Sequence, residues 1–436
     1  MHREVRMRKR RYLLYIGIFL LVVFNYVDRV ALSVAAPAIA AEYNLSPVQV
    51  GYLFSAYLWT YVVCLIPCGF LTDRYGAKVV NGVGVLVWSG ATILTGLASG
   101  FVSLLGSRML MGAAEASTYP AGGRVLRDWA PRSEFGLAAT MLNSGGYAGP
   151  AFGTLLLGWV VSVHGWRWGF YTAGLLGLVW LVGWLVWYRV PETATFVGED
   201  ERAFILRERD SGAKSGGSAD GFGVLLRSRS MIAVAVTQGC AVYTQIVFLT
   251  WLPSYLANVK HMSIVKSGLF TAFPYFAATV FAWVLAHLSD RALAAEGGSS
   301  TGRRRRIVVV SMLSAAVILA APFVDSTPMI LGLITISLTG LATGISLNIA
   351  LAADLLRSPA SAGKAMAIQI TGGNMFGLIA PIATGYIIAA TGSYDLAFVA
   401  GGVLLVTGAV ITLTLTHAPI GGDLPAPAVV PALRRA

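Results

Sequence analysis

The sequence predicts an all-α polytopic membrane protein with twelve transmembrane helices in two six-helix halves. Of its 436 residues, 56% are hydrophobic and only 12% are charged, whereas soluble domains carry roughly 25% charged residues. The apolar residues form runs of about 20 or more, each long enough to cross a hydrocarbon core. Because backbone polar groups in lipid must pair within a helix or a closed barrel, these continuous, non-alternating runs indicate helices.

The helices fall into two sets separated by a polar stretch. We expect the first six near residues 12–41, 48–72, 79–98, 102–126, 134–162 and 168–189, and the last six near 230–258, 264–289, 307–324, 328–353, 364–390 and 395–416. Inside the polar stretch, the charged residues 198–210 predict a surface helix, and the Gly- and Ser-rich residues 211–221 predict a flexible connection. The predicted parts are therefore a basic N-terminus (1–11), an N-terminal half (12–190), a linker (191–228), a C-terminal half (229–416) and a tail (417–436).

The distribution of Lys and Arg predicts the orientation of these helices. If the N-terminus is cytoplasmic, nearly all basic loop residues fall on the cytoplasmic side, and only Arg167, Lys260 and Lys266 fall on the other. The even number of helices then returns the C-terminus to the cytoplasm. The net charge of +12 is thus a topology signal, and we expect no nucleic-acid partner, because the loops are too short to build a basic face.

Four charged residues lie inside predicted helices, where each is costly and therefore a functional candidate. They are Asp28 and Arg29 in the first helix and Arg108 and Glu115 in the fourth. Arg108 and Glu115 are seven residues apart, on one helix face, whereas the adjacent Asp28 and Arg29 point about 100° apart. A buried arginine suits a carboxylate or other oxyanion, and a buried carboxyl can load and release a proton. The alternative is that the four charges form ion pairs that only hold the two helices together.

The loop after the second helix reads Gly69-Phe-Leu-Thr-Asp73-Arg74-Tyr-Gly76-Ala-Lys78. It resembles the signature loop of the major facilitator superfamily, and a degenerate second copy, Asp290-Arg291, follows the eighth helix. The resemblance implies two six-helix halves with the binding site between them. It also implies that Gly69 allows a close helix contact and Gly76 a tight turn. Asp73, Arg74 and Lys78 would form charged contacts that hold the cytoplasmic side closed.

Two longer stretches resemble the anion:cation symporter family within that superfamily. They are Asn25-Tyr-Val-Asp28-Arg29-Val-Ala-Leu-Ser-Val-Ala-Ala-Pro37 and Arg108-Met-Leu-Met-Gly112-Ala-Ala-Glu115-Ala-Ser-Thr-Tyr-Pro120. The resemblance implies a bacterial inner-membrane importer that moves an organic anion together with protons. It makes Arg29 the ligand of the anion, Asp28 and Glu115 the proton-coupling sites with Arg108 as a partner, and Tyr57, Tyr61, Ser346, Asn348, Gln369 and Asn374 residues of the pocket.

Three positions depart from the sugar-acid members of that family. Gly146 stands where those members usually have a glutamine, and Leu65 stands where they have a polar residue, often glutamine. Near Ile349 they often have a tryptophan, which this sequence lacks. A smaller or less hydroxylated carboxylate or sulfonate is therefore the expected substrate. For the four polar pocket residues of the C-terminal half, interhelical hydrogen bonding is the alternative role.

A drug or metabolite exporter of the same fold is the alternative function. Gly145-x-x-x-Gly149-Pro150-x-x-Gly153 resembles part of the helix-five signature of proton-coupled exporters, but Thr154 replaces its last glycine. Glycines at this spacing also serve close helix packing. The missing last glycine and the Asp28-Arg29 pair favour uptake of an anion over export.

The sequence contains no catalytic motif, no His, Cys and acidic cluster for a metal, and no nucleotide-binding P-loop. We therefore expect no enzyme activity, no cofactor and no ATP-driven transport. Two six-helix repeats with asymmetric buried charges suit a transporter that works by alternating access better than they suit a channel. The expected partners are the small organic anion, protons and the lipid bilayer, and the expected state is a monomer.

Overall fold

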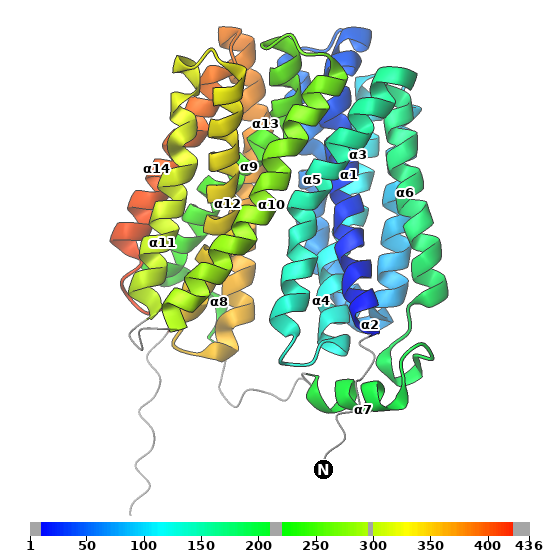
Figure 1. The fold of residues 1–436 in the computed structure, drawn as a ribbon, viewed down its shortest axis with the longest axis vertical. Helices are drawn as coiled ribbons and strands as arrows, with labels where there is room; N and C mark the ends of the chain where they lie inside the picture. Colours follow the sequence, from blue (N-terminus) through cyan, green and yellow to red (C-terminus); the bar gives the residue numbers. More distant parts are fainter. Residues whose placement is uncertain (1–9, 210–219, 295–299, 422–436) are drawn as a thin grey trace, which may run out of the picture.

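The computed structural model describes residues 10–209, 220–294 and 300–421, which form two bundles of long helices standing side by side (Figure 1). The N-terminal bundle contains α1 (Tyr12–Tyr43), α2 (Pro47–Gly96), α3 (Phe101–Glu115), α4 (Thr118–Trp129), α5 (Phe135–His164) and α6 (Trp166–Trp187). The segment between the bundles contains η1 (Pro191–Thr193) and α7 (Glu199–Glu208). The C-terminal bundle contains α8 (Phe222–Arg227), α9 (Arg229–Asn258), α10 (Ile264–Ala294), α11 (Ser300–Ala315), η2 (Ala316–Phe323), α12 (Thr327–Leu355), η3 (Pro359–Ser361), α13 (Ala362–Thr391) and α14 (Asp395–Leu415).

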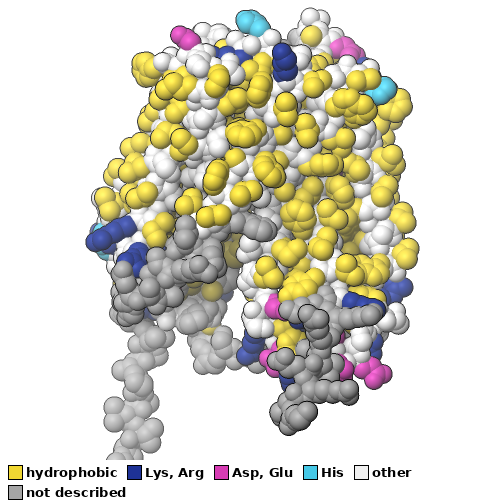
Figure 2. Space-filling view, in the orientation of Figure 1, with side chains coloured by type: hydrophobic (Ala, Val, Ile, Leu, Met, Phe, Trp, Pro, Cys, Tyr) yellow, Lys and Arg dark blue, Asp and Glu magenta, His cyan; other side chains and the backbone are white. Residues whose placement is uncertain are grey.

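Helix length and surface composition both mark an integral membrane protein. Within the described residues, 10 helices are long and apolar enough to cross a membrane. Figure 2 shows hydrophobic side chains over the middle of the surface and most charged side chains near the two ends. The apolar runs that were predicted to be helices are helical, except for a break in the fourth, and α7 confirms the predicted surface helix.

The 50-residue helix α2 includes two of the predicted spans, and the expected turn lies at Gly76. This residue has φ 80° and ψ 159° inside an otherwise helical segment. A positive φ carries little steric cost only in glycine, because other residues have a Cβ that clashes with the backbone. Gly76 therefore makes the tight turn expected of it. This turn divides α2 into a first arm, residues 47–75, and a second arm, residues 77–96.

The predicted fourth helix is interrupted at Ala116 and Ser117, which separate α3 from α4. Pro120 follows four residues after Ala116 and has no N–H to bond the Ala116 carbonyl, which weakens the helix at this point. The Ser117 hydroxyl instead donates to the Ala114 carbonyl oxygen at 2.8 Å. The α3 and α4 pair thus accounts for one span, which is consistent with twelve crossings when the two arms of α2 are taken separately.

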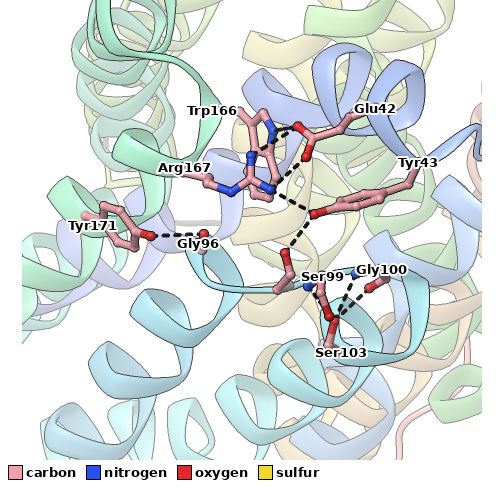
Figure 3. Close-up of polar contacts among 10 residues, drawn as sticks. Glu42, Tyr43, Gly96, Ser99, Gly100, Ser103, Trp166, Arg167 and Tyr171 are labelled. Atoms are coloured by element: carbon pink, nitrogen blue, oxygen red, sulfur yellow. Dashed lines mark hydrogen bonds and ion pairs between the residues drawn. The ribbon is translucent and has the colours of Figure 1, made fainter.

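A polar network fixes the end of the N-terminal bundle that lies away from the N-terminus (Figure 3). Arg167 of α6 donates through Nη2 to Glu42 Oε1 of α1 at 2.7 Å, and Trp166 Nε1 donates to Glu42 Oε2 at 2.7 Å. The Tyr43 hydroxyl donates to the Ala98 carbonyl oxygen at 2.7 Å. These contacts join the last turn of α1 to the first turn of α6 and to the loop before α3.

The two bundles contact each other closely at that same end. The Ser33 hydroxyl of α1 donates to the Leu249 carbonyl oxygen of α9 at 2.7 Å, and the Ser55 hydroxyl of α2 donates to the Leu378 carbonyl oxygen of α13 at 2.6 Å. A Cβ on Gly51 would lie 2.6 Å from the Pro381 carbonyl oxygen. Toward the end that carries the N-terminus, the ribbons of the two bundles diverge (Figure 1).

Part of the linker packs against the N-terminal bundle. Arg11, at the start of α1, pairs through Nη2 with Glu134 Oε1 at 2.7 Å and through Nη1 with Glu201 Oε1 of α7 at 2.9 Å. The hydrogen bond to Glu134 is the main reason that the pKa of Arg11 is raised above its usual value. By contrast, Asp220 contacts the C-terminal bundle, where Lys364 Nζ donates to its carbonyl oxygen at 2.7 Å. Most of the predicted flexible connection, residues 211–219, lies outside the described residues.

Candidate functional site

The centre of the N-terminal bundle holds a buried ion pair between Arg29 of α1 and Glu115 of α3. Arg29 Nε donates to Glu115 Oε2 at 2.8 Å. The side chain of Arg29 is 7% exposed and that of Glu115 is 0% exposed. Removing one partner of such a pair leaves an uncompensated buried charge, so the two groups depend strongly on each other. The ion-pair partner of Glu115 in the structure is thus Arg29 of another helix and not Arg108 of its own helix.

Three tyrosine rings surround the Arg29 guanidinium. Its Cζ lies 4.7 Å from the Tyr26 ring centroid, 5.0 Å from that of Tyr57 and 5.3 Å from that of Tyr61. Aromatic faces attract cations, and this attraction strengthens when the cation is desolvated. Tyr57 and Tyr61, both predicted pocket residues, are buried in the same cluster that Leu378 of α13 packs against. The arginine site therefore adjoins the contact between the two bundles.

The pair leaves hydrogen-bonding capacity unused. Among the described residues, neither Arg29 Nη2 nor Glu115 Oε1 has a hydrogen-bond partner, although both atoms are buried. Buried polar groups are normally paired, so each orphan group calls for an explanation. A permanent cation with a free donor, next to a carboxylate with a free oxygen, is suited to an additional anion and an additional proton.

Asp28 and Arg108 are the other two buried charges of this bundle. Arg108 Nη1 donates to the backbone carbonyl oxygen of Asp28 at 3.3 Å, and not to its carboxylate. Both side chains are buried, with 0% exposure for Asp28 and 1% for Arg108. Within the described part of the chain, both carboxylate oxygens of Asp28 lack a hydrogen-bond partner. The structure thus brings the four predicted intramembrane charges together, with Arg29 and Glu115 in direct contact.

Of the four predicted polar residues of the C-terminal half, Asn348 and Gln369 are buried and bonded to each other, whereas Ser346 is exposed. Asn348 of α12 donates through Nδ2 to the Val234 carbonyl oxygen at 2.8 Å and to Gln238 Oε1 of α9 at 2.9 Å. Gln369 Nε2 of α13 donates to the Asn348 carbonyl oxygen at 3.1 Å. Ser346 donates to the Ala342 carbonyl oxygen at 3.0 Å, and Asn374 is half-buried. In this conformation Asn348 and Gln369 make the interhelical contacts that were their alternative role.

Comparison with known proteins gives the family. A family model described as Major Facilitator Superfamily matches residues 18–299 and 298–435. The chain belongs to the major facilitator superfamily. It is 32% identical over 409 residues to the Escherichia coli protein named "Probable galactarate/D-glucarate transporter GudP", with 90% of each chain covered. It is 30% identical over 400 residues to the Cupriavidus necator protein named "Probable sulfoacetate transporter SauU", with 91% of this chain and 92% of the relative covered.

A solved structure confirms the fold. The crystal structure of a bacterial homologue of the human lysosomal transporter Spinster, in an inward-facing and occupied conformation, matches with a TM-score of 0.72 at 16% identity. The match covers 94% of this chain and 96% of that one. The superfamily match and the relatives named as transporters show that the chain is a transporter and not an enzyme, as the sequence predicted.

The superfamily's signature loop makes its ionic contacts within one bundle in this conformation. Asp73 accepts a hydrogen bond from Arg127 Nη2 of α4 at 3.3 Å and lies 3.7 Å from Arg124 Nη1. Lys78 Nζ donates to the Tyr188 carbonyl oxygen at 3.0 Å. The Arg74 guanidinium carbon lies 5.3 Å from the Tyr75 ring centroid. A closing contact with the other bundle stays a prediction for these residues.

Two expectations about the loop and its copy need separate comment. No heavy atom of the described residues lies within 4 Å of the position that a Gly69 Cβ would take, outside the glycine's own helix backbone and chain neighbours. The close helix contact expected at Gly69 is therefore not made in this conformation. Asp290 and Arg291 lie in α10, but their side chains lie outside the described residues.

The glycines of helix five pack α5 against α1. A Cβ on Gly145 would lie 2.7 Å from Val22 Cβ, and one on Gly149 would lie 2.7 Å from the Val23 carbonyl oxygen. Close approach of two helices accounts for these glycines without an exporter mechanism.

Sequence reasoning missed four residues near the site: Tyr26, Trp88, Thr92 and Gln238. Tyr26 precedes Arg29 by three residues, a spacing that places both on one helix face. Trp88 and Thr92 are one turn apart in the second arm of α2, and the side chains of both face Asp28. Gln238 is a polar residue inside an apolar run. Each of these positions has a signal, but only the packing of the helices shows which group it meets.

Proposed function

We propose that this transporter imports a small organic anion, a carboxylate or a sulfonate, together with protons by alternating access. The observation that supports this best is the buried Arg29–Glu115 pair, in which Arg29 Nη2 has no partner among the described residues. A guanidinium offers a rigid fork of donors that matches the oxygens of a carboxylate, and it stays charged at all physiological pH values. Arg29 is thus the ligand of the anion.

Competition for Arg29 couples the anion to a proton. Ionised Glu115 already occupies Arg29 Nε at 2.8 Å. An entering anion and ionised Glu115 would place two negative charges on one buried cation, which is unfavourable in a low-dielectric site. Protonation of Glu115 removes the second charge and frees the guanidinium for the substrate. Anion and proton therefore bind best together, which is what a symporter requires.

The pocket favours a compact anion. Two relatives are named as probable transporters of galactarate or D-glucarate and of sulfoacetate. In this chain, a Cβ on Gly146 would lie 3.3 Å from Tyr26 Cζ, so the Tyr26 ring fills the space where a longer side chain would stand. An aromatic ring at this position offers fewer hydrogen-bonding groups to substrate hydroxyls than a glutamine does. We therefore favour a carboxylate or sulfonate with few hydroxyl groups.

The conformation fits one state of the proposed cycle. The bundles touch at the end away from the N-terminus, through pairs such as Ser33 and Leu249. With the N-terminus and C-terminus in the cytoplasm of a bacterium, as the distribution of Lys and Arg predicts, this state opens toward the cytoplasm. Release of the anion and proton occurs from it, and the opposite state, with contacts at the signature-loop end, accepts them from outside.

Uptake into proteoliposomes tests the proposal. The purified protein is first screened by thermal shift against D-glucarate, sulfoacetate and benzoate, since a ligand stabilises the state that it binds. Proteoliposomes with an inward proton gradient should then accumulate the anion that gives the largest shift, and a protonophore should abolish the accumulation. Accumulation that a protonophore leaves unchanged contradicts proton coupling. Efflux driven by the same gradient would establish the exporter instead.

A further inference from the structure

Asp28 lies in a closed polar chamber, by which we mean the buried side chains of Trp88, Thr92, Arg108 and Glu115 around its carboxylate. The chamber is formed by α1, the second arm of α2 and α3. Trp88 and Thr92 of α2 face the Asp28 carboxylate, and so do the charged groups Arg108 and Glu115 of α3. Asp28, Trp88 and Thr92 are each 0% exposed. The hydrogen-bonding groups inside this chamber therefore decide how well an ionised Asp28 is stabilised.

The chamber contains donors and acceptors that do not yet pair. Among the described residues, Asp28 Oδ1, Asp28 Oδ2, Trp88 Nε1 and Thr92 Oγ1 are all buried and all lack a hydrogen-bond partner. An indole N–H can only donate, a hydroxyl can donate, and an ionised carboxylate can only accept. The unpaired groups are thus complementary in kind, and small movements of the side chains would satisfy them together.

Arg108 does not donate a hydrogen bond to the Asp28 carboxylate. Arg108 Nη1 donates to the Asp28 backbone carbonyl oxygen at 3.3 Å and contacts Met111 Sδ at 3.1 Å. Its Nε has no partner within the described part of the chain. Arg108 therefore supplies charge at a distance, whereas Trp88 and Thr92 are the uncharged donors that face the carboxylate itself.

We propose that Trp88 and Thr92 are positioning residues that set the proton affinity of Asp28 by donating hydrogen bonds to its ionised form. This inference rests on the proposed function in so far as Asp28 exchanges a proton during transport. Hydrogen bonds to the charged form of a carboxyl favour that form. When Asp28 releases its proton, the two donors close on the carboxylate, and when Asp28 takes a proton, they return to the unpaired arrangement.

Infrared titration of the purified protein tests this inference without a substrate. The protonated carboxyl of Asp28 gives a C=O stretching band, which is assigned by its loss in Asp28→Asn, and its intensity is followed against pH. Thr92→Val removes one donor with little change in volume, so the midpoint should move to higher pH by about one unit, a tenfold gain in proton affinity. Trp88→Phe should move the midpoint in the same direction. Thr92→Ser keeps the hydroxyl donor and should keep the wild-type midpoint.

Thr95→Val is the matched control. Thr95 is also 0% exposed and lies in the same arm of α2, but its hydroxyl donates to the Ala91 carbonyl oxygen at 2.9 Å. This variant should keep the wild-type midpoint. Melting temperature and elution volume show that each variant is folded, and Thr92→Val is decisive if Trp88→Phe does not fold.

The outcomes separate this inference from the proposed function. A wild-type midpoint in Thr92→Val overturns the inference, even if transport is proton-coupled. The inference is also overturned if the titration shows that Asp28 takes up no proton between about pH 4 and pH 10. A shifted midpoint in a protein whose uptake ignores the proton gradient supports the inference and contradicts the proposed function.

Discussion

Replacement of Glu115 by glutamine tests the coupling mechanism most directly. Glu115→Gln mimics the neutral carboxyl: its amide oxygen can still accept from Arg29 Nε, the contact that now measures 2.8 Å. Asn25 faces Glu115, and Asn25 Oδ1 has no partner among the described residues. That oxygen can accept from the new amide group. We therefore expect a folded protein whose Arg29 keeps its full charge for the substrate.

The size of the effect follows from the hydrogen bond that changes. A hydrogen bond to a charged group contributes about 1.5–3 kcal/mol and one between neutral groups about 0.5–1.5 kcal/mol. The substrate in the variant competes with the weaker bond, a difference of about 1.4 kcal/mol, or roughly tenfold in affinity. At alkaline pH, where wild-type Glu115 is ionised, the variant should bind the anion about tenfold more tightly. At acidic pH the two proteins should bind it equally.

Two transport assays on one reconstituted preparation complete the test. Counterflow exchange of the anion should persist in Glu115→Gln, because exchange needs no net proton movement, whereas gradient-driven accumulation should be lost. Glu42→Gln is the control, since Glu42 is another carboxylate of an ion pair, with Arg167 at 2.7 Å, far from the site. Loss of both activities in a folded Glu115→Gln protein would make Glu115 a binding or structural residue. Survival of both would move the proton site to Asp28.

Two further predictions concern Arg29 and the α2 turn. Arg29→Lys should weaken anion binding at least tenfold by calorimetry, because it keeps the charge but loses the fork of donors; near-normal affinity in a folded variant would reject the assignment. Gly76→Ala should lower the free energy of unfolding by about 1 kcal/mol, because Gly76 has φ 80°. Gly69→Ala is its matched control and should not destabilise the protein, since the added methyl group meets open space; equal losses in both would refute the backbone argument.

The contents of the site were predictable only in part. The charges at positions 28, 29, 108 and 115 stand out in apolar runs, because a charge in lipid is costly and needs a reason. Their partners could not be derived from spacing. Arg108 and Glu115 are seven residues apart and share a face of one helix, so spacing alone did not exclude Arg108 as the partner of Glu115. In the structure, Glu115 of α3 pairs with Arg29 of α1 instead. Asn348 and Gln369 were predicted to be pocket residues with interhelical hydrogen bonding as the alternative, and only the structure shows that they bond across helices in this conformation.

The sequence by itself determined the long apolar helices and the intramembrane charges, and its resemblance to the superfamily's signature loop indicated the turn at Gly76. These properties are local: the length of a hydrophobic run is set by the thickness of the bilayer, and a tight turn needs a residue that accepts a positive φ. The tertiary structure alone decided that Tyr26 fills the space beside Gly146, that Trp88 and Thr92 face Asp28, and that Glu115 pairs with Arg29. Each of these contacts joins residues of different helices or different turns, and the angle and rotation at which two helices pack depend on all the side chains between them.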